Sequence, residues 1–200
     1  MQPILPEHRY YHFGPYLAEM SADPDYCDRL LKLGKKLKIS YRKSLIGQIA
    51  HEYVYPLDTE PWIFNEFQIY INTWIEGYRK FSNKANFNPQ YQLISMWINR
   101  MKAKEYNPVH VHFSCNLSFV LFLEVPQKML DEAKTKITTA PNPGQLTFLY
   151  GEEKWSVVSQ KNFTPIKNTL IIFPSDLRHS VIHFNSKGIR TSVSGNINFV

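Results

Sequence analysis

Two histidines stand one residue apart in the segment NPVHVHFSCN, residues 107–116, just before a long apolar run. In an extended chain, side chains at positions i and i+2 point to the same face, with their Cα atoms about 6.5 Å apart. His110 and His112 could therefore converge on one metal ion, and neutral imidazole is a common ligand for iron(II), zinc and copper. The same spacing also fits two surface residues of a strand, so a metal site requires a further ligand.

A third histidine, His179, opens the segment HSVIHF after the apolar run TLIIF and a Phe-Pro-Ser turn. Together with His110 and His112 it could complete a three-ligand site on neighbouring strands, which leaves positions open for substrate and water. Each histidine taken alone also fits a strand or turn residue that binds nothing. His183 shares the strand parity of His179 but lies further along, so we expect it behind the ligands or at the surface.

The last predicted strand, RTSVSGNINF at residues 190–199, has one wholly polar face by alternation: Arg190, Ser192, Ser194, Asn196 and Asn198. Such a face is ordinarily exposed to solvent in an antiparallel sheet, and the alternative is a barrel interior that binds an anion. A buried guanidinium needs a carboxylate or phosphate partner, and a bidentate pair contributes about 1.5–3 kcal/mol. Ser192 could donate to the same anion, and the conjunction of Arg190 with three histidines favours the interior. We predict that Trp97, Asn99 and Asn196 line the cavity.

The elements that must position these residues change character along the chain. From Gln92 onward the apolar period is two, or short apolar runs are bounded by turn residues. The seven predicted strands are QLISMWIN, HVHF, LSFVLFLEV, GQLTFLY, NTLIIFP, HSVIHF and RTSVSGNINF. This pattern predicts a sandwich or a jelly-roll barrel, with residues 126–143 as a loop.

The first ninety residues read as mainly helical. Asp23 and Pro24 are a plausible cap and first turn for a helix, and an amphipathic pattern predicts another from Pro61. We expect a further helix over Ser44 to Tyr55. The chain is interpreted as a single domain, residues 1–200, in which residues 1–90 support a β core over residues 91–200.

Composition excludes several classes of protein. The longest apolar stretch is far shorter than a bilayer span, and MQPILPEHRYYHF lacks the pattern of a signal peptide, so we expect a cytoplasmic protein without a membrane partner. Cys27 and Cys115 form no spaced framework, which favours reduced thiols, and Cys115 is predicted to be buried. The net charge of +6 is dispersed, and no aromatic-plus-basic stripe indicates nucleic acid.

These motifs together resemble a known family. WIN at 97–99, NPVHVH at 107–112, FPSDLRH at 173–179 and RTS at 190–192 are similar to motifs of the iron(II) and 2-oxoglutarate dependent oxygenases, especially an uncharacterised phage and marine-bacterial branch. The resemblance covers about residues 90–200 well and the helical part loosely. One position departs from the usual HxD or HxE pattern, because His112 stands where the family has a carboxylate.

The resemblance implies a mainly β fold: a double-stranded β-helix, or cupin-like jelly roll, with the N-terminal helical region packed on it. It implies that His110, His112 and His179 bind Fe(II), and that Arg190 and Ser192 bind the co-substrate 2-oxoglutarate. With O2, such enzymes hydroxylate a substrate and release succinate and CO2. A neutral third ligand makes the site one charge more positive. Asp176, Glu105 or a water could replace His112 as the ligand.

Two other classes of function fit the same residues. A three-histidine metalloenzyme that does not use 2-oxoglutarate, either a cupin-type dioxygenase or a zinc enzyme, also uses HxH ligands. Asn116 and Leu117 stand where the usual cupin has a glutamate, which disfavours that variant. A non-catalytic jelly-roll module could instead bind a glycan or an acidic partner on its polar strand face. The substrate is open between a small molecule and a peptide, and no feature of the sequence indicates an oligomeric state.

Overall fold

The computed structural model of the chain describes residues 14–137 and 139–200. The segment on which the expectation about a signal peptide depends, residues 1–13, lies outside the described residues. Among the described residues, no helix combines the length and the apolar character needed to cross a bilayer.

Ten strands and three α-helices make up the described fold, together with one short 3-10 helix at Arg42–Ser44. The strands are β1 (Ala18–Ser21), β2 (Glu52–Val54), β3 (Tyr91–Lys102), β4 (Asn107–His110), β5 (Leu117–Glu124), β6 (Leu146–Leu149), β7 (Gln160–Phe163), β8 (Thr169–Pro174), β9 (Arg178–Val181) and β10 (Ile189–Phe199). The helices are α1 (Pro24–Gly34), α2 (Trp62–Ser82) and α3 (Gln127–Lys134).

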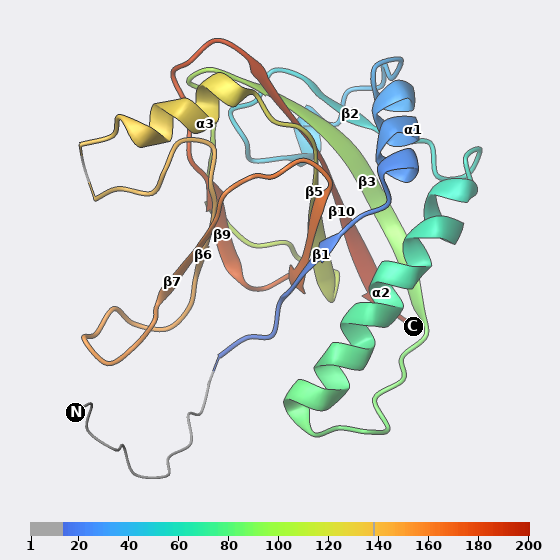
Figure 1. The fold of residues 1–200 in the computed structure, drawn as a ribbon. Helices are drawn as coiled ribbons and strands as arrows, with labels where there is room; N and C mark the ends of the chain where they lie inside the picture. The colour runs from blue at the N-terminus through green and yellow to red at the C-terminus, as the bar shows by residue number, and fades with distance from the viewer. Residues whose placement is uncertain (1–13, 138) are drawn as a thin grey trace, which may run out of the picture.

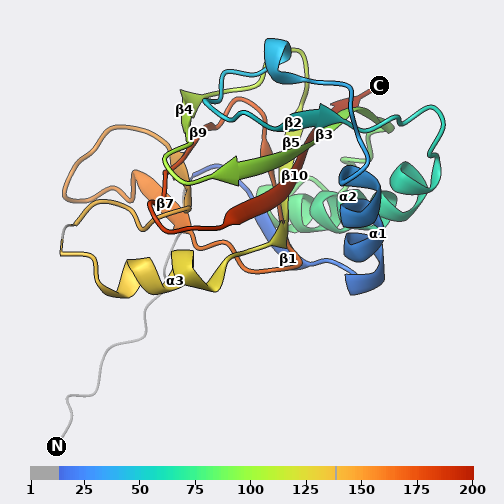
Figure 2. The ribbon, with the colours of Figure 1, turned by 90° about the horizontal axis from the view of Figure 1, so that it is seen from above.

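The strands form two antiparallel sheets that face each other. The large sheet has the order β1-β8-β5-β10-β3-β2, and the small sheet has the order β4-β9-β6-β7. Figure 1 shows α1 and α2 on one side of the large sheet and β6, β7 and β9 on its other side, and Figure 2 shows the same layers from above. Neighbours along the chain repeatedly change sheets, as in a jelly roll. The predicted mainly β fold, a double-stranded β-helix with helices packed on it, is confirmed.

The central strand β5 separates two hydrophobic cores by simple alternation. Phe119 and Leu121 point to the helices, whereas Val120 and Phe122 point into the space between the sheets. Seven of the eight residues of this strand are buried, because both faces of the large sheet are covered. The apolar run that precedes Glu124 in the sequence is thus a strand that is buried on both faces.

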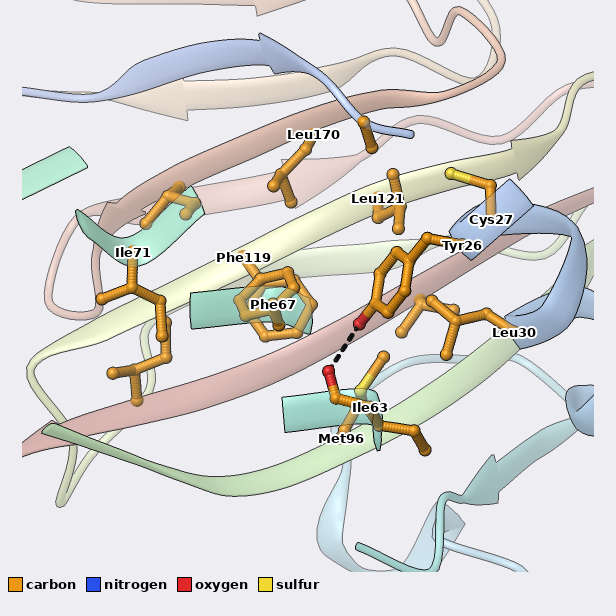
Figure 3. Close-up of a cluster of buried hydrophobic side chains, with 14 of the residues drawn as sticks. Tyr26, Cys27, Leu30, Ile63, Phe67, Ile71, Met96, Phe119, Leu121 and Leu170 are labelled. Atoms are coloured by element: carbon orange, nitrogen blue, oxygen red, sulfur yellow. Dashed lines mark hydrogen bonds between the residues drawn. The ribbon is translucent and has the colours of Figure 1, made fainter. Parts of the chain in front are cut away.

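The helical layer packs on the outer face of the large sheet. The Asp23 carboxylate accepts hydrogen bonds from the backbone N–H groups of Asp25 and Tyr26, at 2.7 and 3.0 Å, and so caps α1 as predicted. The Tyr26 hydroxyl donates to the Ile63 carbonyl at 3.0 Å and ties α1 to α2 (Figure 3). Phe67 of α2 meets Phe119 of β5 with ring centroids 4.4 Å apart. These contacts fix the helices against the sheet.

Three local predictions are wrong. Residues 44–55 do not form a helix; they contain a loop and β2, which pairs with β3. Pairing with β3 is a long-range contact that overrides local propensity, and the aromatic and β-branched residues of β2 suit it. Residues 126–143 contain α3, whose one buried side chain, Met129, gives too weak a signal to predict a helix. The third is β4, which ends at His110 rather than at Phe113, and strands β1 and β7 were not predicted at all.

Candidate metal centre

The register of the small sheet brings two of the predicted ligands together. β4 and β9 pair antiparallel with His110 opposite His179, and the centroids of these two rings lie 4.2 Å apart. His112 follows the end of β4, where its backbone N–H donates to the Ser175 carbonyl at 2.9 Å. The His112 ring lies 5.2 Å from each of the other two, measured between centroids. The three imidazoles therefore converge although His112 lies outside the strand.

The arrangement suits a transition-metal ion. One ligand nitrogen from each of His110, His112 and His179 lies within 4.8 Å of the others, and within the described part of the chain this is the whole group. Imidazole bonds of about 2.1 Å would draw such nitrogens to about 3 Å from one another, which side-chain rotations can supply. Asp176 and Glu105 do not join the group. The Glu105 carboxylate instead accepts from the backbone N–H groups of Ala50 and Lys102, at 2.9 and 2.7 Å.

Backbone carbonyls fix the tautomers of two of the histidines. Nδ1 of His110 lies 2.7 Å from the Pro108 carbonyl, and Nδ1 of His179 lies 2.8 Å from the Leu177 carbonyl. Because a carbonyl only accepts, Nδ1 carries the proton in each ring, and the lone pair is on Nε2. An orienting hydrogen bond on the other ring nitrogen is typical of metal-binding histidines.

The electrostatic environment keeps all three rings neutral. Burial, followed by the charge of His110, lowers the pKa of His179 to about 3 and that of His112 to about 4. Burial also lowers the pKa of His110 below its ordinary value. A cation can then bind near pH 7 without first displacing protons from the ligands.

Arg190 is the most unusual charge in the described structure. Its side chain is 2% exposed, on β10, opposite Met101 of β3. Nη1 lies 3.1 Å from the sulfur of Met101, the guanidinium carbon lies 5.1 Å from the ring centre of Phe122, and Nε has no hydrogen-bond partner. Burial lowers the pKa of Arg190 to about 10, so the group remains charged at neutral pH without a carboxylate beside it. This is the environment expected of an anion-binding residue that awaits its ligand.

One cavity of about 440 Å³ joins these groups. Its lining includes the three histidines and Arg190, together with the predicted residues Ser192, Trp97 and Asn99. Asn99 accepts from the Trp97 indole N–H at 3.1 Å and donates to the Ser194 hydroxyl at 3.0 Å, which holds the wall of the cavity.

Three other predicted positions lie elsewhere. Asn196 is outside the cavity lining, because its side-chain oxygen accepts from the Ser118 hydroxyl at 2.8 Å. His183 is exposed at the surface. Cys115 is half-buried rather than buried, and like Cys27 it is a free thiol.

The sequence analysis missed part of the cavity wall. Glu52 on β2, Asn107 on β4 and the loop at residues 44–47 all line the cavity. Burial raises the pKa of Glu52 to about 7, an effect that the positive charge of Arg42 opposes and the negative charge of Glu105 reinforces. A strand prediction for residues 52–54 would have identified Glu52, because the register of β2 with β3 determines which face of the sheet its side chain occupies.

Comparison with known proteins places this geometry in a family. Residues 95–196, just over half of the 200-residue chain, match the family described as "Putative 2OG-Fe(II) oxygenase". The chain belongs to this family. As a 2OG-Fe(II) oxygenase it is an oxidoreductase whose cofactors are Fe(II) and 2-oxoglutarate, and O2 is the oxidant. The predictions of an enzyme and of these cofactors are confirmed.

Solved 2OG-Fe(II) oxygenases share the fold at low sequence identity. An oxidoreductase of this family from Burkholderia pseudomallei is 17% identical, with a TM-score of 0.58 over 91% of this chain and 84% of that one. The viral collagen prolyl hydroxylase of Paramecium Bursaria Chlorella virus-1 is 15% identical, with a TM-score of 0.54 over 94% and 97%. HygX from Streptomyces hygroscopicus, solved with nickel and 2-oxoglutarate, is 7% identical, with a TM-score of 0.60 over 92% and 83%. No curated protein of matching sequence was found.

Proposed function

We propose that this chain is a dioxygenase in which His110, His112 and His179 hold Fe(II), and Arg190 and Ser192 bind 2-oxoglutarate. It hydroxylates a substrate and releases succinate and CO2. The observation that carries this proposal is the buried Arg190 guanidinium, which has no anionic partner among the described residues and lines the same cavity as the three imidazoles. A buried cation of this kind costs stability unless a ligand neutralises it.

The residues present fit both groups. Three neutral imidazoles, two of them oriented through Nδ1, supply a facial ligand set that leaves positions open on the cavity side. The guanidinium of Arg190 could hold the far carboxylate of 2-oxoglutarate through its planar fork, and the Ser192 hydroxyl could add a second donor. When bound, iron and 2-oxoglutarate together supply the oxidising power for attack on a C–H bond.

The other residues of the cavity position the groups that bind and exclude water from the reacting atoms. Phe122 and Met101 pack around the Arg190 side chain and hold its fork in one direction. Trp97 and Asn99, which are hydrogen-bonded to each other, form a rigid part of the cavity wall beside His112. A cavity walled by packed side chains limits water near the reacting atoms, which suppresses side reactions.

A direct test uses the absorbance of the anaerobic complex. Purified protein mixed with Fe(II) and 2-oxoglutarate without oxygen is expected to show a weak visible charge-transfer band that Arg190→Ala abolishes at the same 2-oxoglutarate concentration. The absence of the band in the wild type, or an unchanged band in the variant, would contradict the assignment.

The three-histidine ligand set itself supports a second candidate, a metalloenzyme of this fold that does not need 2-oxoglutarate. It would leave Arg190 without a role, which is why we rank it second. Metal analysis with turnover assays in the presence and absence of 2-oxoglutarate separates the two. Membership of an enzyme family removes the non-catalytic binding module from consideration.

We further propose that residues 1–200 form one domain, with residues 1–90 supporting the β core. β1 and β2, which come from the first ninety residues, join the large sheet, and this supports a single domain. A cytoplasmic location is proposed because both cysteines are free thiols, the form that a reducing compartment maintains. Assignment to the phage and marine-bacterial branch stays a prediction from the motifs.

A further inference from the structure

A carboxyl group faces the cavity from the edge of the large sheet. In the register of this sheet, Glu52 of β2 pairs with Asn99 of β3, and Asn99 pairs with Ser192 of β10. Residues directly opposite each other in antiparallel strands point to the same face. The row Ser192–Asn99–Glu52 therefore turns all three side chains toward the cavity, whose lining includes each of them. Two strand spacings, about 10 Å, separate Glu52 from Ser192.

Among the residues that the structure describes, none forms a hydrogen bond or an ion pair that accounts for this carboxyl. The residue is 1% exposed, and its Oε2 is buried without a hydrogen-bond partner. Buried carboxylates in proteins are ordinarily paired or hydrogen-bonded, so an orphaned one requires an explanation. Glu52 does not belong to the metal-binding group formed by the three histidines. Metal binding therefore does not explain its position.

The described cation whose charge acts on Glu52 does not form an ion pair with it. The positive charge of Arg42 acts on the carboxyl, but the Arg42 side chain is exposed. None of the ion pairs formed by the described residues includes Glu52. The backbone of Gly47 lies over the carboxyl, where an added methyl group would be 3.6 Å from Oε1. The loop at residues 44–47 thus lies against the carboxyl, and Glu52 is part of the cavity lining.

We propose that Glu52 binds a cationic nitrogen, an ammonium or guanidinium group, of the substrate that this enzyme hydroxylates. This inference rests on the proposed function, because it takes the Arg190 and Ser192 end of the cavity to be occupied by 2-oxoglutarate. The cavity lining then contains a guanidinium and a carboxyl group, neither of which forms an ion pair with another described residue. Arg190 receives the carboxylate of the co-substrate, and Glu52 receives the cation of the substrate.

The aromatic wall favours a cation over a neutral donor. The Trp97 ring lies beside Tyr41 and His112, with centroid distances of 5.4 and 5.9 Å, and belongs to the cavity lining with Glu52. A cation beside an aromatic face gains attraction that a neutral amide or hydroxyl does not. A neutral donor would satisfy the hydrogen bond of Oε2 but leave the charge uncompensated.

The test measures binding of a small cation without the need to know the substrate. Calorimetric titration of the metal-free protein compares n-butylguanidinium with n-butylurea, which has nearly the same shape and no charge. We expect wild-type protein to bind butylguanidinium at least tenfold more tightly than butylurea, and Glu52→Gln to lose this preference. Glu76→Gln, which changes the net charge equally on the exposed face of α2, serves as the matched control and should behave as wild type.

Two results would overturn the inference: equal affinity of wild-type protein for the two probes, or an unchanged preference in Glu52→Gln. Folding of the variant is checked by its thermal unfolding temperature in the absence of ligand, which should not fall, because an unpaired buried charge is removed. The charge-transfer band with Fe(II) and 2-oxoglutarate is recorded on the same samples. A normal band with failed cation binding refutes the role of Glu52 alone, whereas a missing wild-type band refutes the proposed function.

Competition distinguishes the two sources of such a cation. L-arginine and L-lysine represent free metabolites, and acetyl-Gly-Arg-Gly-amide and acetyl-Gly-Lys-Gly-amide represent peptide side chains. Displacement of butylguanidinium by one pair at lower concentration supports the inference and identifies the source. Failure of all four to displace the probe contradicts it.

Discussion

Replacement of Arg190 by methionine should make the ligand-free protein more stable while removing its response to 2-oxoglutarate. Burial lowers the pKa of Arg190 from 12.5 to about 10. For a base, a lowered pKa means that folding disfavours the charged form, so the cost is fully present at every pH below the folded value. At about 1.4 kcal/mol per unit, the unpaired charge costs about 3 kcal/mol near pH 7.5. Methionine has a similar length and suits the contacts with Met101 and Phe122.

The substitution should raise the stability of the ligand-free protein and weaken its binding of 2-oxoglutarate. Arg190→Met is expected to raise the free energy of unfolding by up to about 3 kcal/mol, or roughly 5–10 °C in Tm for a chain of this size. In wild-type protein, 2-oxoglutarate at one hundred times its Kd should return about 2.7 kcal/mol by mass action. Loss of the charge pair should weaken 2-oxoglutarate binding by about 2–5 kcal/mol, which is 30-fold or more, so the variant gains almost nothing from the ligand.

Thermal unfolding of both proteins with Fe(II), with and without 2-oxoglutarate, gives the four Tm values needed. Arg100→Met, the same change on β3 in a half-buried side chain, is the control and should shift stability by no more than about 0.5 kcal/mol. A lower ligand-free Tm for Arg190→Met together with an undiminished shift on 2-oxoglutarate addition would refute the reasoning. In that case the guanidinium would be a structural group.

Three further predictions concern the other charged and titratable groups. Because the pKa values of His112 and His179 are lowered to about 4 and about 3, the unfolded chain binds more protons than the folded one below pH 6.5. The free energy of unfolding of the metal-free protein should therefore fall by about 1.4 kcal/mol per pH unit for each ring as the pH drops from 6.5 to about 4. Urea unfolding measured at several pH values should show a weaker dependence of this free energy on pH in His112→Asn. Fe(II) affinity, measured by competition with a chelator, should fall by more than about 100-fold in His112→Ala and be largely retained in His112→Asp. Removal of a residue that only hydrogen-bonds to a metal ligand already costs about 10–100-fold, so loss of a ligand should cost more. Equal affinity of His112→Ala and wild type would exclude His112 as a ligand. The pKa of Glu52 is raised from 4.5 to about 7, so the charged form is disfavoured in the fold and wild-type stability is lost as pH rises through this window. Glu52→Gln should match wild type near pH 4.5 and exceed it by up to about 3 kcal/mol at pH 8, and a pH-independent difference in Tm would count against a buried carboxyl.

The part of the site that could be predicted from the sequence is the part set by strand alternation. Arg190 and Ser192 share a face because they lie two residues apart within β10, and that relation needs no tertiary information. His110 and His112 converge for the same reason, although β4 ends between them. The position of His179 opposite His110 depends on the pairing of β4 with β9, which the resemblance implied and the residues alone could not fix.

What could not be predicted depends on contacts between distant segments. Residues 44–55 look helical in isolation, and only pairing with β3 makes β2 a strand and turns Glu52 toward the cavity. A backbone hydrogen bond from Gln48 to the Tyr106 carbonyl holds the preceding loop against β4. Because β2 was not predicted, the sequence analysis missed one wall of the cavity and, with it, the one carboxyl group that the described residues contribute to the lining.

The same physical argument applies to Arg190 of β10 and Glu52 of β2, which both line the cavity. A fold selected for stability alone would place apolar side chains at Arg190 and Glu52, because both lie on a sheet face otherwise packed by residues such as Phe122. Departures from local consistency of this kind concentrate at functional sites, where a ligand supplies the missing partner. The three neutral imidazoles lie in the same cavity as both charges. An anion at Arg190 and a cation at Glu52 would bind to different strands of the large sheet, so the opposite charges would direct co-substrate and substrate to separate positions in the cavity.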